Sequence, residues 1–212
     1  MANNSYGGLG SVPPIIKNLL IINALVWLAQ IAAIRQGFPL EYYGALWSLD
    51  TGNFKVWQLV TYMFMHSAVD PQDGTIVLSH LFFNMFTLWM FGSNLERFWG
   101  SKRFLTFYLL CGLVAGITQL VLTSGSSTVG ASGAIMGVMA GFAYLFPNTE
   151  MMIMFIPFPI KAKYLVPGFM ALDIFGGISG GDNIAHWAHL GGAFAGLIIV
   201  IIWNKTNKKT FY

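Results

Sequence analysis

Apolar segments constrain this chain most, because six of them occupy most of its 212 residues. An α-helix needs about 20 apolar residues to cross a bilayer. The segments lie at about residues 15–34, 76–98, 104–122, 132–146, 164–178 and 184–203. Hydrophobic residues make up 56% of the chain and charged residues 9%, whereas a soluble domain carries about 25% charged residues. The sequence therefore predicts an all-α polytopic membrane protein, with one domain spanning residues 1–212 and containing six transmembrane helices.

The basic residues predict the orientation of these segments. If the N-terminus lies inside and the chain crosses six times, Arg35 and Lys55 lie outside. All other Lys and Arg residues lie inside: Lys17, Arg97, Lys102, Arg103, Lys161, Lys163, Lys205, Lys208 and Lys209. Basic residues concentrate on the cytoplasmic side of membrane proteins. Residues 1–10 lack the basic region of a signal or transit peptide. We therefore expect a multi-pass protein of the plasma (bacterial inner) membrane with both termini cytoplasmic.

A small-residue turn, Gly130-Ala131-Ser132-Gly133-Ala134, opens the fourth apolar segment. A serine between glycines at a helix start has an accessible hydroxyl, and the first-turn N–H groups beside it lack intrahelical partners. This combination suits a nucleophile with a nearby oxyanion site. The alternative is an ordinary serine N-cap with glycines for close packing.

Costly polar residues from three distant segments gather at one membrane depth. Ser132 begins the fourth segment, His189 lies about five residues into the sixth, and His80 lies near the same end of the second. Asn84 is one helical turn beyond His80, on the same face. Ionisable residues within a membrane are candidates for function. We predict an active site at the outer side, with His80, Asn84 and first-turn N–H groups stabilising an oxyanion.

Glycines indicate which segments pack together. Gly133, Gly137 and Gly141 repeat every four residues along the fourth segment, and Gly192 and Gly196 do so along the sixth. Such stripes allow close contact between membrane helices. Their packing would bring His189 to Ser132, as the base that accepts the hydroxyl proton.

No carboxylate is expected beside His189. Asp173 and Asp182 are predicted near the outer surface, and Asp173 would pair locally or line the route of a substrate. The expected catalytic unit is therefore a Ser–His dyad and not a triad.

In several motifs the chain resembles the rhomboid family of intramembrane serine proteases. The motifs are His80-Leu-Phe-Phe-Asn84, Gly92-Ser-Asn-Leu-Glu96-Arg97, Gly130-Ala-Ser132-Gly133, Ala188-His189-Leu-Gly-Gly192 with Gly196, and the aromatic loop ending Thr61-Tyr62-Met63-Phe64-Met65-His66. The resemblance covers essentially the whole chain. It implies a compact six-helix bundle that cleaves single-pass transmembrane proteins near the outer membrane face, without metal or cofactor.

The resemblance also implies roles for individual residues. Ser132 maps to the family's nucleophile, His189 to its general base, and His80 and Asn84 to its oxyanion donors. Two positions depart from the family pattern. Trp57-Gln58 stands where bacterial members often have Trp-Arg, which puts the anchoring of the first loop at risk. Met136 stands where many members place an aromatic residue beneath the catalytic histidine.

Other functions are weighed against the protease. A non-catalytic rhomboid-like protein would bind or escort transmembrane clients, but such proteins typically lack the Ser–His pair. A transporter would need polar groups through the full depth of the membrane or discontinuous helices at its midplane, whereas here the polar groups cluster on one side. A metal site built from the four histidines is not favoured, because no ligand motif accompanies them. His186 is expected to pack or lie at the interface, and His66 to anchor the loop.

The expected partners are single-pass substrates and the lipid bilayer, with no nucleic acid.

Overall fold

A computed structural model describes residues 12–70, 72–152, 158–179 and 184–206. The elements in chain order are α1 (Pro14–Arg35), α2 (Leu40–Gly44), β1 (Leu46–Trp47), η1 (Leu49–Thr51), α3 (Gln58–Thr61), η2 (Tyr62–Phe64), α4 (Ser79–Thr87), η3 (Leu88–Gly92), α5 (Ser93–Trp99), α6 (Ser101–Leu122), β2 (Ser127–Thr128), α7 (Ser132–Leu145), β3 (Glu150–Met151), β4 (Ile160–Lys161), α8 (Ala162–Ser179) and α9 (His186–Thr206). The strands form two short antiparallel pairs, β1 with β2 and β3 with β4. Helices dominate the described residues, which confirms the all-α prediction.

Among the residues that the structure describes, three helices are long and apolar enough to cross a membrane: α1, α6 and α9. The other predicted segments are also helical, but each departs from a long uninterrupted span. Helix α7 is shorter, α8 contains Pro167, and the π-helical turn η3 separates α4 from α5. The structure therefore supports three spans by length and composition, and the count of six stays a prediction.

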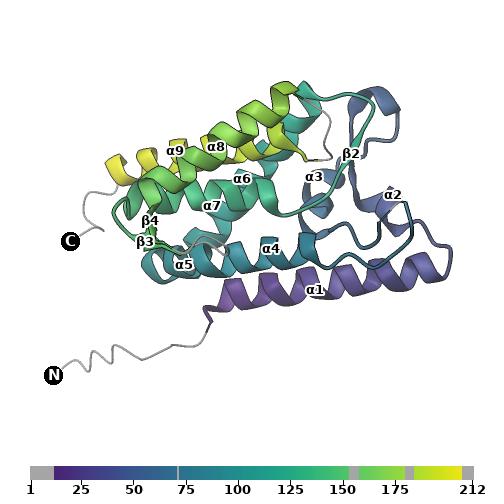
Figure 1. The fold of residues 1–212 in the computed structure, drawn as a ribbon, viewed down its shortest axis with the longest axis horizontal. Helices are drawn as coiled ribbons and strands as arrows, with labels where there is room; N and C mark the ends of the chain where they lie inside the picture. Colours follow the sequence, from purple (N-terminus) through teal and green to yellow (C-terminus); the bar gives the residue numbers. More distant parts are fainter. Residues whose placement is uncertain (1–11, 71, 153–157, 180–183, 207–212) are drawn as a thin grey trace.

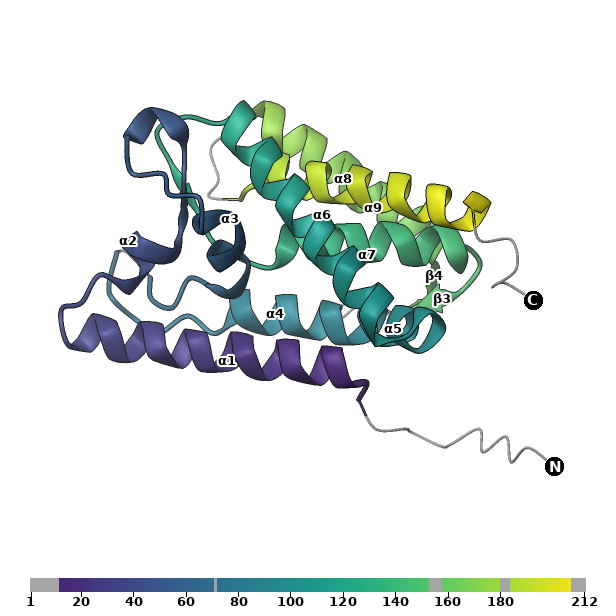
Figure 2. The same cartoon turned by 180° about the vertical axis from the view of Figure 1, so that it is seen from behind.

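Helix α7 lies at the centre of the bundle. Figure 1 and the reverse view in Figure 2 show α1 beside α4 on one side of the bundle and α8 and α9 on the other, with α7 between them. Helix α7 packs mainly against α9 and α6, and also touches α8, α5 and α4. Every residue from Gly133 to Phe142 is buried. The N-terminal end of α7 is therefore held in place by several helices at once.

The glycine stripes of α7 and α9 lie face to face. A methyl group at Gly192 would collide with the carbonyl oxygen of Gly133, and one at Gly196 with that of Gly137. The contact is reciprocal, because a Cβ at Gly137 would lie 2.8 Å from the carbonyl oxygen of Gly192. Only small residues permit such an approach of two helix backbones. The two helices are thus locked in one register along their shared length.

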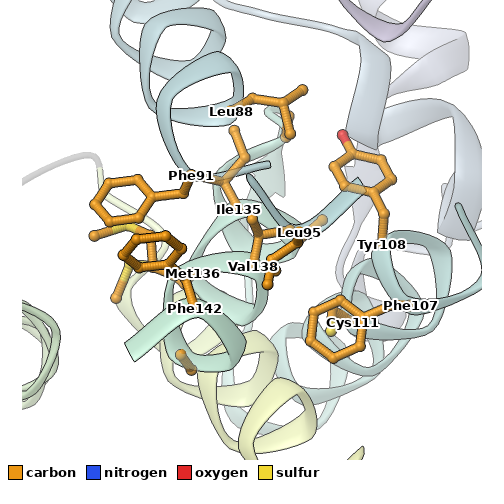
Figure 3. Packing of buried hydrophobic residues seen from close by; sticks show 14 of the residues in the cluster. Leu88, Phe91, Leu95, Phe107, Tyr108, Cys111, Ile135, Met136, Val138 and Phe142 are labelled. Atoms are coloured by element: carbon orange, nitrogen blue, oxygen red, sulfur yellow. The ribbon is translucent and has the colours of Figure 1, made fainter. Parts of the chain in front are cut away.

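Large apolar side chains fill the interior on the other faces of α7. Figure 3 shows this cluster, in which residues of η3, α5, α6 and α7 interlock. Leu88 and Leu95 are fully buried, and Phe91 packs edge-on against Phe142 with ring centroids 5.1 Å apart. Cys111 is also buried here and forms no disulfide. Because such a close-packed interior has low compressibility, each helix fixes the positions of its neighbours.

The first loop is anchored by the residue that departs from the family pattern. The Gln58 side chain is buried, and its Oε1 accepts hydrogen bonds from the Lys55 N–H at 3.0 Å and the Trp47 N–H at 3.4 Å. Its Nε2 donates to the carbonyl oxygen of Asn53 at 3.3 Å. Glutamine therefore ties the loop together without a guanidinium group.

The same loop is fastened to the turn that precedes α7. Strand β1 pairs with β2, with Leu46 opposite Thr128. The Asp50 carboxylate accepts the Gly125 N–H at 2.9 Å. This hydrogen bond holds the pKa of Asp50 below its usual value, since it favours the charged form. The loop and the segment before Ser132 are thus joined by a strand pair and a hydrogen bond.

A buried carboxylate from α5 caps the start of α1. Glu96 accepts hydrogen bonds from the N–H groups of Ile15 and Ile16, each at 2.9 Å, and from the Ser101 hydroxyl at 2.7 Å. The first N–H groups of a helix lack intrahelical partners, and the helix dipole favours a negative charge there. Glu96 therefore joins α1 to α5 and α6, the structural role expected for it.

We predict that Glu96→Gln destabilises the bundle by about 1–2 kcal/mol, because the amide has one acceptor atom and no charge with which to hold the start of α1. Thermal unfolding of the purified protein in detergent measures this change. Glu150→Gln is the control, since Glu150 is exposed on β3. Equal unfolding temperatures for the two variants would contradict the capping role.

Candidate active site

Ser132 lies at the end of a turn that glycine makes possible. Gly130 has a φ of 129°, which L side chains rarely adopt. Its N–H donates to the carbonyl oxygen of Tyr62 at 2.9 Å, and the Tyr62 hydroxyl donates to the carbonyl oxygen of Gly112 at 2.7 Å. The first loop and α6 therefore both hold this turn. The chain then enters α7, with Ser132 as its first residue.

The Ser132 hydroxyl contacts His189 and does not cap its own helix. Oγ lies 2.7 Å from Nε2 of His189, whereas Ala131 occupies the N-cap position of α7, with no side-chain cap hydrogen bond. His189 lies in the first turn of α9, and the glycine contact described above sets its distance from α7. The alternative of a simple serine N-cap thus does not describe the structure. A hydroxyl and an imidazole at this distance can exchange a proton.

The structure corrects the prediction that no carboxylate orients His189. Asp173 lies on α8 with only 8% of its surface exposed. Its Oδ1 is 2.9 Å from Nδ1 of His189. Ser132, His189 and Asp173 therefore form a chain of two hydrogen bonds, so the expected arrangement of a dyad alone is wrong. Asp182, the other carboxylate considered, lies outside the described residues.

Membrane depth was the signal that would have identified Asp173. It lies five residues before the end of the fifth predicted segment, residues 164–178, and His189 lies five residues after the start of the sixth, residues 184–203. Adjacent antiparallel segments place such positions at the same depth. The rule that an ionisable residue inside a membrane segment is a functional candidate applied to Asp173 as well.

His186 shares the same carboxylate oxygen. Its Nδ1 is 2.7 Å from Oδ1 of Asp173, and its side chain is buried. His186 precedes His189 by three residues, so both rings lie on one face of α9. Asp173 therefore bridges two imidazoles, whereas sequence reasoning expected His186 only to pack or to lie at the interface.

His80 presents a ring nitrogen to the turn before Ser132. Its Nδ1 accepts the Ser67 N–H at 3.3 Å, so the neutral ring carries its proton on Nε2. That nitrogen faces Gly130, where an added Cβ would lie 3.0 Å from it and 3.7 Å from Oγ of Ser132. His80 is thus arranged as a hydrogen-bond donor beside the serine, as its predicted role requires.

Asn84 lies one turn further along α4, at the wall of a cavity. Its Nδ2 donates to the carbonyl oxygen of His80 at 2.9 Å, and its second N–H remains for another acceptor. Its Oδ1 is buried and has no partner among the described residues. Asn84 and Ser132 line the same cavity.

This cavity has a volume of about 360 Å³ and is mainly apolar. Its walls come from α4, η3, α7, α8 and α9, and its polar lining groups include Ser132, His189 and Asn84. The remaining lining residues are Phe83, Phe86, Thr87, Met90, Phe91, Ile135, Met136, Met139, Leu165 and Phe169. Met136, the second departure from the family pattern, thus forms part of the wall one turn beyond the serine. An apolar space that leads to a serine suits an apolar chain segment.

The histidines separate into two pairs. His66 is fully buried and stands edge-on to His80, with ring centroids 5.1 Å apart. Burial and then the neighbouring His80 lower the pKa of His66 to about 3, so this ring is neutral. His186 and His189 form the second pair together with Asp173, and the ligand atoms of these three residues are within 4.8 Å of one another. The four histidines therefore do not converge on a single site that one metal ion could occupy.

Comparison with known proteins places this geometry in a family. Residues 53–205 match the Rhomboid domain, which is more than half of the chain. The chain belongs to the rhomboid family. The expectation from the motifs is thereby confirmed at the level of the family.

Three relatives are identical to this rhomboid at about a quarter of the aligned positions. The mitochondrial "Presenilin-associated rhomboid-like protein A" of Danio rerio is 26% identical over 210 residues, covering 94% of this chain and 52% of the relative. "Rhomboid-like protease 3" of Toxoplasma gondii is 26% identical over 168 residues, covering 78% and 59%. The mitochondrial "Rhomboid protein 1" of Saccharomyces cerevisiae is 27% identical over 192 residues, covering 81% and 56%. The chain thus spans between half and three fifths of the length of these relatives.

The names of these relatives correct the predicted location. Two of the three are described as mitochondrial proteins, so the assignment to a plasma (bacterial inner) membrane is wrong. Basic residues report which side of a membrane a loop faces. They do not report which membrane contains the protein, so the distribution of basic residues could not support the predicted location.

We predict that Asp173→Asn lowers the reactivity of Ser132 towards a fluorophosphonate probe by at least about 10-fold. Replacing the carboxylate that orients a catalytic histidine can cost about 10⁴-fold in rate, because the imidazole then adopts the wrong tautomer. Labelling rates of the purified protein measure the change. Asp70→Asn is the matched control, since Asp70 lies in the first loop and accepts a hydrogen bond from Gln72. Unchanged labelling of Asp173→Asn would contradict the orienting role.

Proposed function

We propose that this rhomboid is an intramembrane serine protease that cleaves single-pass transmembrane proteins. The observation that supports this most is the chain of contacts from Ser132 through His189 to Asp173, at 2.7 Å and 2.9 Å. Such a nucleophile, base and orienting group are the parts that acyl transfer needs. The proposal includes the predicted bundle of six transmembrane helices. If all six cross the membrane, the active site lies within it.

The first chemical step forms an acyl-enzyme. Oγ of Ser132 attacks the carbonyl carbon of the scissile peptide while its proton passes to Nε2 of His189. Asp173 keeps the Nδ1–H of that ring directed away from the serine and stabilises the imidazolium that forms. When the tetrahedral intermediate collapses, the C–N bond breaks and His189 gives its proton to the leaving amine.

The second step returns the enzyme to its starting state. Water takes the place of the amine, gives a proton to His189, and attacks the acyl carbon. The Ser132–acyl bond then breaks and the hydroxyl recovers its proton. In both steps the oxyanion accepts hydrogen bonds from Nε2 of His80 and the first-turn N–H groups of α7, with the amide of Asn84 as a further donor.

The cavity supports a transmembrane segment as the substrate. Phenylalanine and methionine side chains of α4, η3 and α8 line it together with Ser132, so an apolar chain can lie against these helices and reach the serine. The carbonyl groups of an intact substrate helix are already hydrogen-bonded. A substrate segment must therefore unwind at the cut, and helix-weakening Gly or Pro near it should favour cleavage.

A non-catalytic role as an escort of transmembrane proteins is the competing proposal. It requires no contact between Ser132 and His189, so the hydrogen bond between them favours the protease. The names of the relatives include both "protease" and "rhomboid-like protein". A direct assay of this chain therefore has to decide between the two functions.

We predict that purified protein in detergent or liposomes cleaves a labelled single-pass substrate with a Gly- or Pro-containing transmembrane segment, and that Ser132→Ala abolishes cleavage. The reason is that alanine has no hydroxyl to form the acyl-enzyme. Ser127→Ala is the control, because Ser127 lies on exposed β2. Equal cleavage by wild type and Ser132→Ala would exclude this nucleophile, and binding of intact substrates without cleavage by wild type would favour the escort.

A further inference from the structure

Three potential metal ligands meet beside the proposed catalytic serine. They are Oδ1 of Asp173, Nδ1 of His186 and Nδ1 of His189, and all lie within 4.8 Å of one another. The carboxylate oxygen is 2.7 Å from the first nitrogen and 2.9 Å from the second. The Ser–His–Asp chain itself uses only two of these residues. His186 is therefore a buried side chain of a type that binds metals, and the proposed chemistry assigns it no role.

The chemical types and spacing of these atoms suit zinc. Two imidazoles and one carboxylate are a common zinc ligand set, with a fourth position left to water. Metal–ligand bonds of about 2.0–2.1 Å in a tetrahedral site place neighbouring ligand atoms about 3.3 Å apart. For the three atoms to surround an ion, the Asp173 oxygen must move away from both nitrogens and the two rings must adjust with it. His186 and His189 are held three residues apart on the same face of α9.

A metal at this point would change the proton position on His189. Nδ1 of that ring now faces the carboxylate, and Nε2 faces the Ser132 hydroxyl. If Nδ1 binds an ion, the proton of the neutral ring moves from Nδ1 to Nε2. Nε2 then donates to Oγ of Ser132 and no longer accepts its proton. The ion also takes the Asp173 oxygen that orients the ring.

The geometry points to an inhibitory zinc site formed by Asp173, His186 and His189. Zinc binding switches the serine off by fixing His189 in the tautomer that cannot act as a base. The inhibitory part rests on the proposed function, because it needs Ser132 to be a nucleophile. The binding part does not, because the three ligands would be present even if the protein performed no catalysis.

Binding is tested first in Ser132→Ala, which keeps all three ligands. Purified protein in detergent is titrated with Zn²⁺, and with Co²⁺ as a spectroscopic probe. We expect one ion per chain, the intense visible absorption of four-coordinate Co²⁺, and X-ray absorption of the zinc form that shows two imidazole nitrogens. Absence of stoichiometric binding, or a site without imidazole ligands, would overturn the proposal whatever the protein's activity.

Variants of His186 in the same Ser132→Ala background identify the site. His186→Gln should weaken zinc binding by more than about 10-fold, since loss of an outer-shell partner alone costs roughly 10–100-fold. His186→Cys supplies a new zinc ligand and should recover binding. Glu150→Gln, which changes an exposed carboxylate on β3, should bind as the parent does. Zinc binding that is equal in His186→Gln and its parent would overturn the assignment.

Inhibition is measured separately in protein that retains Ser132. Saturating Zn²⁺ should lower the rate of fluorophosphonate labelling by at least 10-fold, and a chelator should restore it. In His186→Gln, compared with its own metal-free rate, inhibition should need correspondingly more zinc. Labelling that is unaffected by bound zinc would overturn the inhibitory part. Absence of labelling even without metal would instead count against the proposed protease, and the binding result would stand.

Discussion

The close approach of α7 and α9 is the constraint on which the rest of the site depends. Glycines on both helices allow one backbone to touch the other, with no side chain between Gly133 and Gly192. Ser132 comes immediately before Gly133, and His189 comes three residues before Gly192. The 2.7 Å contact between hydroxyl and imidazole therefore follows from backbone packing. Two flexible side chains held only by each other would lose more conformational entropy on ordering.

The surrounding elements hold this contact from outside. The first loop reaches the turn before Ser132 through Tyr62, and Gln58 and Asp50 secure the loop in turn. On the far side, α8 supplies the carboxylate that orients His189. Because each of these supports comes from a different part of the chain, the site forms only when the bundle is assembled. This arrangement suits a preorganised active site.

Much of this arrangement could be predicted from the sequence because membrane depth and helix periodicity are regular. Apolar length located the helices, the glycine spacing indicated that the fourth and sixth segments pack together, and depth brought His80 and Asn84 to the same end. These inferences need only the period of a helix and the thickness of a bilayer. They do not depend on the details of side-chain packing.

Contacts that depend on how a helix rotates about its axis were missed. Asp173 was assigned to the outer surface although its depth matches that of His189. Depth does not show which face of α8 turns inward, and the role of His186 depends on the same rotation. Pro167 also interrupts the hydrogen-bonding pattern of that helix. Gln58 was expected to weaken the loop, yet its amide reaches several backbone groups, which only the folded loop reveals. The identity of the membrane is encoded in neither depth nor charge.

Mapping of covalent probe attachment in wild type and His189→Gln tests the central claim most directly, because it asks whether the helix contact activates the serine. The protein is treated with a fluorophosphonate and the modified residue is located by mass spectrometry. The account predicts modification at Ser132 in wild type and loss of that modification in His189→Gln, with an unchanged unfolding temperature. Equal modification of Ser132 in both proteins, or modification at another residue, would contradict it.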